Sequence, residues 1–125
     1  MNDFYLLIVG SRTFSNYIML KESCDYLLSN HLNDNIIIVS GGARGADSLA
    51  EQYAKEKKYS LVIFKAQWNV YGKTAGYRRN VEMHKYISQF PNRGVVAFWD
   101  GQSKGTAHNF KLAKIYDNPI RTVRF

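Results

Sequence analysis

Residues suited to binding an anion gather in four short segments of this 125-residue chain. Glycines let backbone N–H groups approach a ligand, hydroxyl and guanidinium groups donate hydrogen bonds to phosphate oxygens, and aromatic rings stack on bases. Together these residue types predict a pocket for a phosphate-bearing or nucleotide-like ligand. The candidate ligand-binding residues are Gly10, Ser11, Arg12, Ser40, Gly41, Gly42, Arg44, Gly45, Asp47, Trp68, Lys73, Gly76, Arg79, Asn80, Asp100, Gly101, Ser103, Gly105 and Thr106.

The segment SGGARGAD has the composition of a phosphate-binding turn. Gly41 and Gly42 permit a sharp turn and close backbone approach, and Gly45 permits close packing where the next helix begins. The first turn of a helix offers unpaired N–H groups to a phosphate. The segment has neither the Gly-Lys-Ser/Thr of a Walker A loop nor the spacing of the dinucleotide fingerprint. A tight turn without a ligand is the alternative for this segment alone.

Two further segments, DGQSKGT and GSRTF, have a similar composition. The hydroxyls of Ser103 and Thr106 either donate to a phosphate or cap the following helix, and the sequence leaves both roles open. Arg12 either reaches a phosphate as a charged fork or stays in solvent. Two glycine-rich loops are more specific for a ligand than one.

The segment WNVYGKTAGYRRN combines aromatic and basic residues. Trp68 or Tyr71 can stack on a base. Lys73, Arg78 or Arg79 can meet a phosphate. Basic residues at a helix start oppose the helix dipole, and an anionic ligand would offset that cost. The alternative is a basic helix start with its aromatic rings buried beneath it.

Strand-like and helix-like segments alternate along the chain, which predicts an α/β doubly wound sheet. The first four apolar runs are nearly continuous, a pattern typical of parallel strands covered by helices on both faces. In such sheets ligands bind beyond the carboxyl ends of the strands, where the four segments above lie. The predicted strands are 4–9, 36–39, 61–64, 94–99 and 119–123, and the predicted helices are 15–31, 45–58, 75–90 and 105–116.

Apolar stripes at helical spacing predict which side chains the helices bury. In 75–90 the stripe comprises Tyr77, Val81, His84, Ile87 and Phe90. In 105–116 it comprises Ala107, Phe110, Ala113 and Tyr116.

Composition and charge limit the classes of partner. Seventeen Lys and Arg against ten Asp and Glu give a net charge of +7, which favours an anionic partner. The single cysteine, Cys24, cannot form an internal disulfide, and no apolar run approaches the ~20 residues of a membrane span. We therefore expect a cytoplasmic protein without a membrane partner. The histidines show no metal-ligand spacing, so neither metal nor cofactor is expected.

Three of these segments, VSGGARGAD, WNVYGKTAGYRRN and FWDGQSKGT, occur in an order that resembles the YspA-like (cpYpsA-related) branch of the SLOG superfamily. Its relatives include the "lonely guy" phosphoribohydrolases and DNA-processing protein A. The resemblance spans nearly the whole chain. It implies one Rossmann-like nucleotide-binding domain over residues 1–125, with five parallel strands in the order 3-2-1-4-5 and helices on both faces.

The chain departs from the phosphoribohydrolases at the position of their catalytic glutamate. Those enzymes place it closely after a Pro-Gly-Gly-x-Gly-Thr loop, whereas here Thr106 is followed by Ala107, His108 and Asn109. The candidate acids or nucleophiles that remain are Asp47, Glu82 and Asp100. Asp47 is expected at a helix start, where the dipole would keep it ionised and make it a poor proton donor.

The sequence thus leaves three functions open. The first is binding, as sensor or sequestering protein, of an anionic nucleotide-like small molecule such as an ADP-ribose derivative. The second is an enzyme that hydrolyses an N-glycosidic bond of a nucleotide, and the third, less favoured, is DNA binding. The aromatic content of 14% and the resemblance also suggest a homodimer or higher homo-oligomer.

Overall fold

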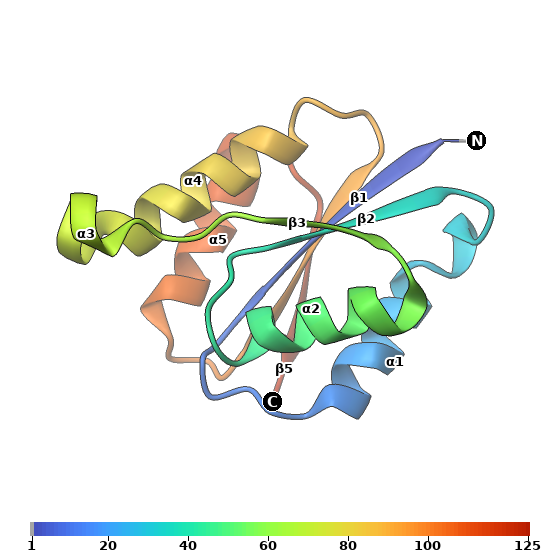
Figure 1. Ribbon diagram of the computed structural model, residues 1–125, viewed down its shortest axis with the longest axis horizontal. Coiled ribbons are helices and arrows are strands. Elements are labelled where there is room, and N and C mark those ends of the chain that lie inside the picture. Colours follow the sequence, from blue (N-terminus) through green and yellow to red (C-terminus); the bar gives the residue numbers. More distant parts are fainter. Residues whose placement is uncertain (1) are drawn as a thin grey trace.

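The computed structural model describes residues 2–125, in which strands and helices alternate (Figure 1). The strands are β1 (Asp3–Gly10), β2 (Asn35–Ser40), β3 (Ser60–Ile63), β4 (Arg93–Trp99) and β5 (Ile120–Arg124). The helices are α1 (Tyr17–Leu27), α2 (Ala46–Lys57), α3 (Trp68–Tyr71), α4 (Ala75–Ile87) and α5 (Lys104–Ile115). Two 3-10 turns, η1 (Ser29–His31) and η2 (Gly72–Thr74), complete the set.

All five strands pair in parallel in the order β3-β2-β1-β4-β5, which confirms the predicted fold class and strand order. The chain moves outward from β1 to β3 and then returns to place β4 on the other side of β1. Strand order therefore reverses between β1 and β4, the position at which doubly wound sheets form ligand crevices.

The side chains of β1 alternate between two apolar layers. Leu6 and Ile8 pack in one cluster with residues of α1 and α2, while Leu7 and Val9 pack in a second cluster with residues of α4. Figure 1 shows the same division, with α1 and α2 on one side of the sheet and α4 and α5 on the other. Two covered faces explain why the β1 run is apolar without a break.

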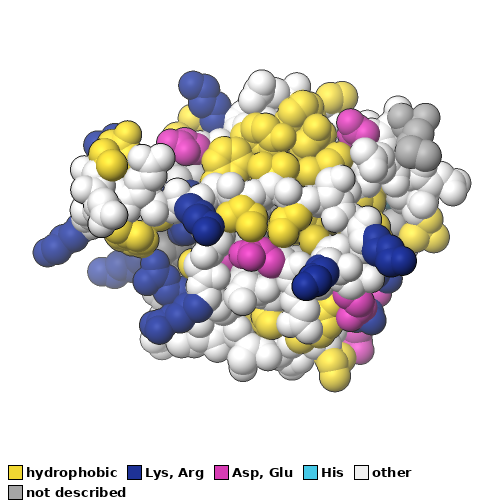
Figure 2. Space-filling view, in the orientation of Figure 1, with side chains coloured by type: hydrophobic (Ala, Val, Ile, Leu, Met, Phe, Trp, Pro, Cys, Tyr) yellow, Lys and Arg dark blue, Asp and Glu magenta, His cyan; other side chains and the backbone are white. Residues whose placement is uncertain are grey.

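Strand β3 differs from the prediction that the first four strands are covered on both faces. It lies at the edge of the sheet, and Leu61 and Ile63 are 38% and 39% exposed. An edge strand has a neighbour on one side only, and an apolar pattern of four residues does not distinguish an edge from a centre. Figure 2 shows apolar side chains exposed on this side of the molecule.

The first helix is shorter than the predicted 15–31. The side chain of Asn16 accepts a hydrogen bond from the backbone N–H of Met19 at 3.0 Å, so Asn16 caps the helix that begins at Tyr17. The helix ends at Leu27, and the 3-10 turn η1 replaces its predicted last turn.

The buried faces of α4 and α5 are more polar than the predicted stripes. On α4, Tyr77 is 44% exposed, whereas Asn80 is buried. On α5 the buried residues are Thr106, Asn109, Leu112 and Ala113, of which only Ala113 belongs to the predicted stripe. The apolar pattern misplaced this face because the buried asparagine and threonine are hydrogen-bonded, which makes their burial tolerable. Within residues 2–125, no helix has both the length and the apolar character needed to cross a bilayer.

Candidate functional site

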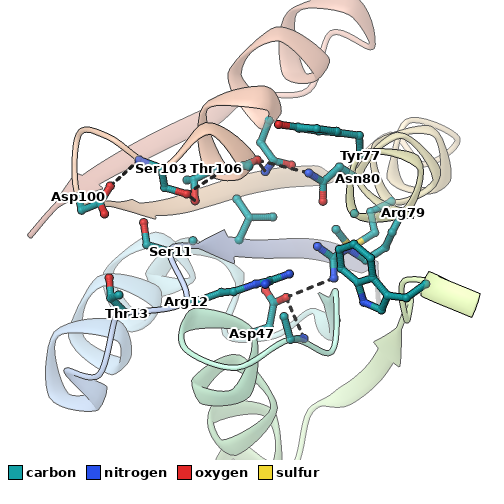
Figure 3. A pocket seen from close by; sticks show the side chains of 18 of the residues that line it. Ser11, Arg12, Thr13, Asp47, Tyr77, Arg79, Asn80, Asp100, Ser103 and Thr106 are labelled. Atoms are coloured by element: carbon teal, nitrogen blue, oxygen red, sulfur yellow. Dashed lines mark hydrogen bonds and ion pairs between the residues drawn. The ribbon is translucent and has the colours of Figure 1, made fainter. Parts of the chain in front are cut away.

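A pocket of about 430 Å³ opens at the carboxyl ends of β1 and β4, where strand order reverses (Figure 3). It is formed by the loop after β1, the starts of α2, α4 and α5, and the short helix α3. The candidate residues that line it are Gly10, Ser11, Arg12, Asp47, Trp68, Lys73, Gly76, Arg79, Asn80, Asp100, Ser103, Gly105 and Thr106.

The structure places the other candidates outside this lining: Ser40, Gly41, Gly42, Arg44, Gly45, Gly101 and Glu82. Glu82 and Arg44 are exposed, and Ser40 is fully buried behind the pocket. The Ser40 hydroxyl donates to the backbone carbonyl of Asp47 at 3.1 Å and accepts from the N–H of Gly42 at 3.3 Å. Ser40 therefore braces the loop that positions Asp47.

Two glycines of the loop after β2 shape its backbone. Gly42 has a φ of +71°, and a Cβ added there would lie 3.0 Å from the side chain of Ile63 and 3.2 Å from that of Lys65, toward β3. Gly45 has a φ of +78°, and its added Cβ would lie 2.5 Å from the carbonyl oxygen of Arg12. Gly45 thus brings the loop after β1 against the start of α2, two of the segments that form the pocket.

The loop after β1 places a buried hydroxyl at the pocket. Ser11 is 3% exposed, and its backbone N–H donates to the Phe98 carbonyl at 2.9 Å, which ties this loop to β4. Among residues 2–125, its Oγ makes no hydrogen bond of 3.5 Å or less, although the hydroxyl lies close enough to the Asp100 carboxylate to help lower the pKa of that group. Figure 3 shows the Ser11 side chain pointing toward the loop that carries Asp100 and Ser103. A buried hydroxyl without a partner is costly unless a bound molecule supplies one.

The loop after β4 is held by its own hydrogen bonds. Asp100 Oδ1 accepts from the backbone N–H groups of Gln102 at 2.9 Å and Ser103 at 2.8 Å. Ser103 Oγ accepts from the Thr106 N–H at 3.4 Å and so caps α5, whose first turn borders the pocket. The backbone N–H donors hold the pKa of Asp100 below its ordinary value. Asp100 is therefore an ionised anchor of the loop.

Asp47 carries a carboxyl group at the start of α2, 7% exposed and facing the pocket. Burial raises its pKa to about 6, although the Arg79 guanidinium and the Ala43 backbone N–H both act to lower it. The N–H of Ala43 donates to Oδ2 at 3.1 Å, and Arg79 Nη1 lies 4.0 Å from the same oxygen. Desolvation therefore opposes the helix dipole at Asp47. The carboxyl is still mostly ionised at pH 7, as expected from its place at a helix start, but it takes up a proton closer to neutral pH than an ordinary aspartate does.

The raised pKa of Asp47 predicts a pH dependence of stability. In the folded state the Asp47 carboxyl holds its proton up to about pH 6, whereas in the unfolded state it does so only up to about pH 4. The protonated carboxyl therefore contributes fully to the unfolding free energy at low pH, and this contribution is lost as pH rises between those values. The unfolding free energy of Asp47→Asn minus that of the wild type should rise by about 2 kcal/mol from pH 4 to pH 7. Urea unfolding at several pH values measures this difference.

Asp100→Asn is the matched control for that measurement. Its pKa is lowered, so Asp100 is ionised in both states above about pH 5 and the corresponding difference should stay flat from there to pH 7. Parallel stability curves for Asp47→Asn and the wild type would show that Asp47 titrates normally.

Arg79 joins α4 to the loop after β2. Its Nη1 donates to the Gly41 carbonyl at 2.9 Å, and its side chain is only 12% exposed. Its buried Nε has no hydrogen-bond partner in the described part of the chain. Burial lowers the pKa of Arg79, but a guanidinium stays charged at neutral pH. The pocket therefore contains a fixed positive charge beside Asp47.

Aromatic side chains stand at the mouth of the pocket. Trp68 is 48% exposed, and the Arg12 guanidinium lies 5.7 Å from the centre of its ring. A Cβ added at Gly76 would lie 3.4 Å from the Trp68 ring, in ordinary van der Waals contact, so the ring packs over the start of α4. Ring and guanidinium together can cover a flat aromatic group.

Sequence reasoning missed Val9, Thr13, Ala43, Tyr77, Met83 and Asn109, which also line the pocket. Asn109 and Met83 follow the candidates Thr106 and Asn80 by three residues, so helical spacing was the signal that could have identified them. Within residues 2–125, no group of three or more His, Cys, Asp or Glu side chains is arranged to hold a metal ion.

Comparison with known proteins adds a family to this geometry. The model of the YspA, cpYpsA-related SLOG family matches residues 4–71. Gene 61 protein of Mycobacterium phage D29 is 29% identical over 123 residues, an alignment that covers 92% of each chain. The crystal structure of a predicted subunit of tRNA methyltransferase from Methanocaldococcus jannaschii aligns with 12% identity and a TM-score of 0.42, over 100% of this chain and 68% of that one. The family model spans more than half of the sequence, and the chain belongs to the YspA, cpYpsA-related SLOG family.

Proposed function

We propose that this protein binds an anionic nucleotide-derived small molecule, such as an ADP-ribose derivative, in the pocket between the loops after β1 and β4. The observation that carries the proposal is the buried Ser11 hydroxyl, which makes no hydrogen bond of 3.5 Å or less within residues 2–125 and points toward the loop of Asp100 and Ser103 that precedes α5. A phosphate there would accept from this hydroxyl and from the free N–H groups of the first helical turn.

The rest of the pocket suits the remainder of a nucleotide. Trp68 and Arg12 offer a stacking surface at the mouth, and Arg79 supplies a fixed positive charge inside. A volume of about 430 Å³ falls within the usual range of small-molecule pockets. Membership of the SLOG family is in keeping with a nucleotide-related ligand.

Asn109, which follows Thr106 by three positions and lines the pocket, supports binding without rapid turnover. Asn109 is an amide, which neither gives nor takes a proton at neutral pH. Its Nδ2 donates to the Gly105 carbonyl at 3.2 Å, and its Oδ1 is 3.0 Å from His84 Nε2. No carboxylate therefore stands at the point where the resembling phosphoribohydrolases carry their catalytic glutamate.

Calorimetric titration with ADP-ribose and with adenosine monophosphate, followed by chromatography of the same samples, tests the proposal. We expect saturable binding and no release of free base at ordinary enzyme rates, which are on the order of 1–1000 s⁻¹. Absence of binding by both compounds would contradict the proposal. An affinity confined to oligonucleotides, falling steeply with salt, would favour DNA binding instead.

A second candidate function is hydrolysis of an N-glycosidic bond, and the state of Asp47 favours it. A buried carboxyl with a pKa of about 6 is suited to general acid catalysis near neutral pH. Under this alternative, base release would be lost in Asp47→Asn. Asp100 anchors its own loop, so it serves as the comparison. If base release were lost in Asp100→Asn and kept in Asp47→Asn, Asp47 would be excluded as the acid.

A further inference from the structure

A chain of buried polar side chains runs behind the pocket wall, between α4, α5 and the segment before β5. His84 is fully buried, and Asn109 and Asn118 are 2% and 4% exposed. The sequence placed His84 in an apolar stripe, and Asn109 and Asn118 matched no motif. Three buried polar side chains in contact need matched donors and acceptors.

The hydrogen bonds of this chain run in one consistent direction. Asn109 Nδ2 donates to the Gly105 carbonyl at 3.2 Å, so its Oδ1 accepts from His84 Nε2 at 3.0 Å. On the other side of the ring, Asn118 Nδ2 donates to His84 Nδ1 at 3.1 Å and to the His84 carbonyl at 3.2 Å. Asn118 Oδ1 accepts from Arg93 Nε at 2.6 Å.

Only a neutral His84 with its proton on Nε2 satisfies all of these contacts. A proton on Nδ1 would face the Asn118 amide donor. Burial lowers the pKa of His84 to about 4, with a small further decrease from nearby His108, while the bond to Asn109 opposes the shift. The ring therefore stays neutral at the pH of the cell.

The chain ends at the pocket itself. Asn109 lines the pocket, and the Gly105 carbonyl to which it donates also lies 3.4 Å from Nδ2 of the pocket residue Asn80. The Asn109 amide thus spans from the carbonyl in the first turn of α5 to the imidazole behind it. If the imidazole donor is removed, the amide keeps only one of the two contacts that set its orientation, the bond to the Gly105 carbonyl.

We propose that His84 is a positioning residue that fixes the Asn109 amide, and with it the first turn of α5, in the arrangement that receives the ligand. The inference rests on the proposed ligand pocket, and it assigns a residue that touches no ligand. His84 acts through Asn109, whose amide forms part of the pocket wall.

Two amide substitutions separate the contact of His84 with Asn109 from its contact with Asn118. In His84→Gln, the longer side chain can bring its amide N–H near the place of imidazole Nε2 and so keep the donor to Asn109. In His84→Asn, the shorter side chain can keep the contact to Asn118 but falls short of Asn109. Both variants bury one neutral amide in place of the ring, so their losses of stability should be comparable.

Calorimetry with ADP-ribose should show a Kd within about threefold of the wild type for His84→Gln and a rise of about tenfold or more for His84→Asn. Equal affinities in the two folded variants would overturn the proposal. If the wild type binds neither ADP-ribose nor adenosine monophosphate, the proposed function fails, and the positioning role is then decided without ligand.

Nitrogen NMR tests the positioning role of His84 without ligand. In the wild type, His84 should show the neutral Nε2–H tautomer. The side-chain amide signals of Asn109 and the backbone signal of Gly105 should move in His84→Asn and stay close to the wild type in His84→Gln. A wild-type Nδ1–H tautomer, or equal shifts in both variants, would show that His84 does not position Asn109.

Discussion

Gly45→Ala is expected to lower the unfolding free energy by about 4 kcal/mol, which is a large share of the total for a domain of this size. Gly45 has φ +78° and ψ −129°, the mirror image of the β region, where a side chain is strained by about 1–3 kcal/mol. The added Cβ would also lie 2.5 Å from the Arg12 carbonyl oxygen, and relieving that clash costs about 1–3 kcal/mol more.

Gly72→Ala is the matched control, because Gly72 has nearly the same backbone angles, φ +55° and ψ −131°. No atom of the described residues lies within 4 Å of its added Cβ. It should lose only the strain contribution, about 1–3 kcal/mol. Chemical denaturation of both variants gives the difference. Equal losses would mean that the contact between the loops after β1 and β2 does not constrain the fold.

Gly105→Val is expected to weaken binding of ADP-ribose by about tenfold or more while the protein stays as stable as the wild type. Gly105 lies in the first turn of α5 at the pocket, and its added Cβ would have no atom of residues 2–125 within 4 Å. Because Gly105 lines the pocket, we expect the added carbons of valine to narrow the space proposed for a phosphate. Valine also forms helix more readily than glycine, so no loss of stability is expected.

Gly105→Ala, with one added carbon, should weaken binding less than Gly105→Val, and calorimetry on the two variants gives the comparison. A folded Gly105→Val protein with wild-type affinity would place the ligand away from the start of α5. Gly42 is a poorer choice for this test, since its added Cβ would point toward Ile63 and Lys65 instead of the pocket.

The sheet was predictable because its central strands carry continuous apolar runs between amphipathic segments. The run at 61–64 looked the same, yet β3 is an edge strand with Leu61 and Ile63 more than a third exposed. Four consecutive apolar residues indicate a tendency to form a strand. They do not indicate how many neighbouring strands it has, because that number is a property of the whole sheet.

The convergence of the loops on one pocket was also predictable, because parallel strands end at the same edge of a sheet. Which glycines line the pocket was not. A glycine in the sequence indicates a backbone conformation and says nothing of the direction in which the missing side chain would point. Gly105 lines the pocket, whereas Gly42 and Gly45 shape the backbone beside it.

The buried polar residues were the least predictable part of the candidate site. The raised pKa of Asp47 was not predictable, because the sequence shows its helix start but not the depth of its burial. His84 and Asn109 are 25 positions apart in the chain, and their hydrogen bond exists only once α4 and α5 pack together. Hydrophobic periodicity assigns such residues to the exposed face or to the apolar core, because it does not consider their hydrogen-bond partners.

The proposed nucleotide-derived ligand lies between the loop after β1 and the start of α5. The most direct measurement is amide NMR of the labelled protein during titration with ADP-ribose. We expect saturable shifts concentrated in the backbone N–H groups of residues 10–13 and 103–106, with smaller changes near Trp68. Shifts centred on another surface, or none at millimolar ligand, would contradict this placement.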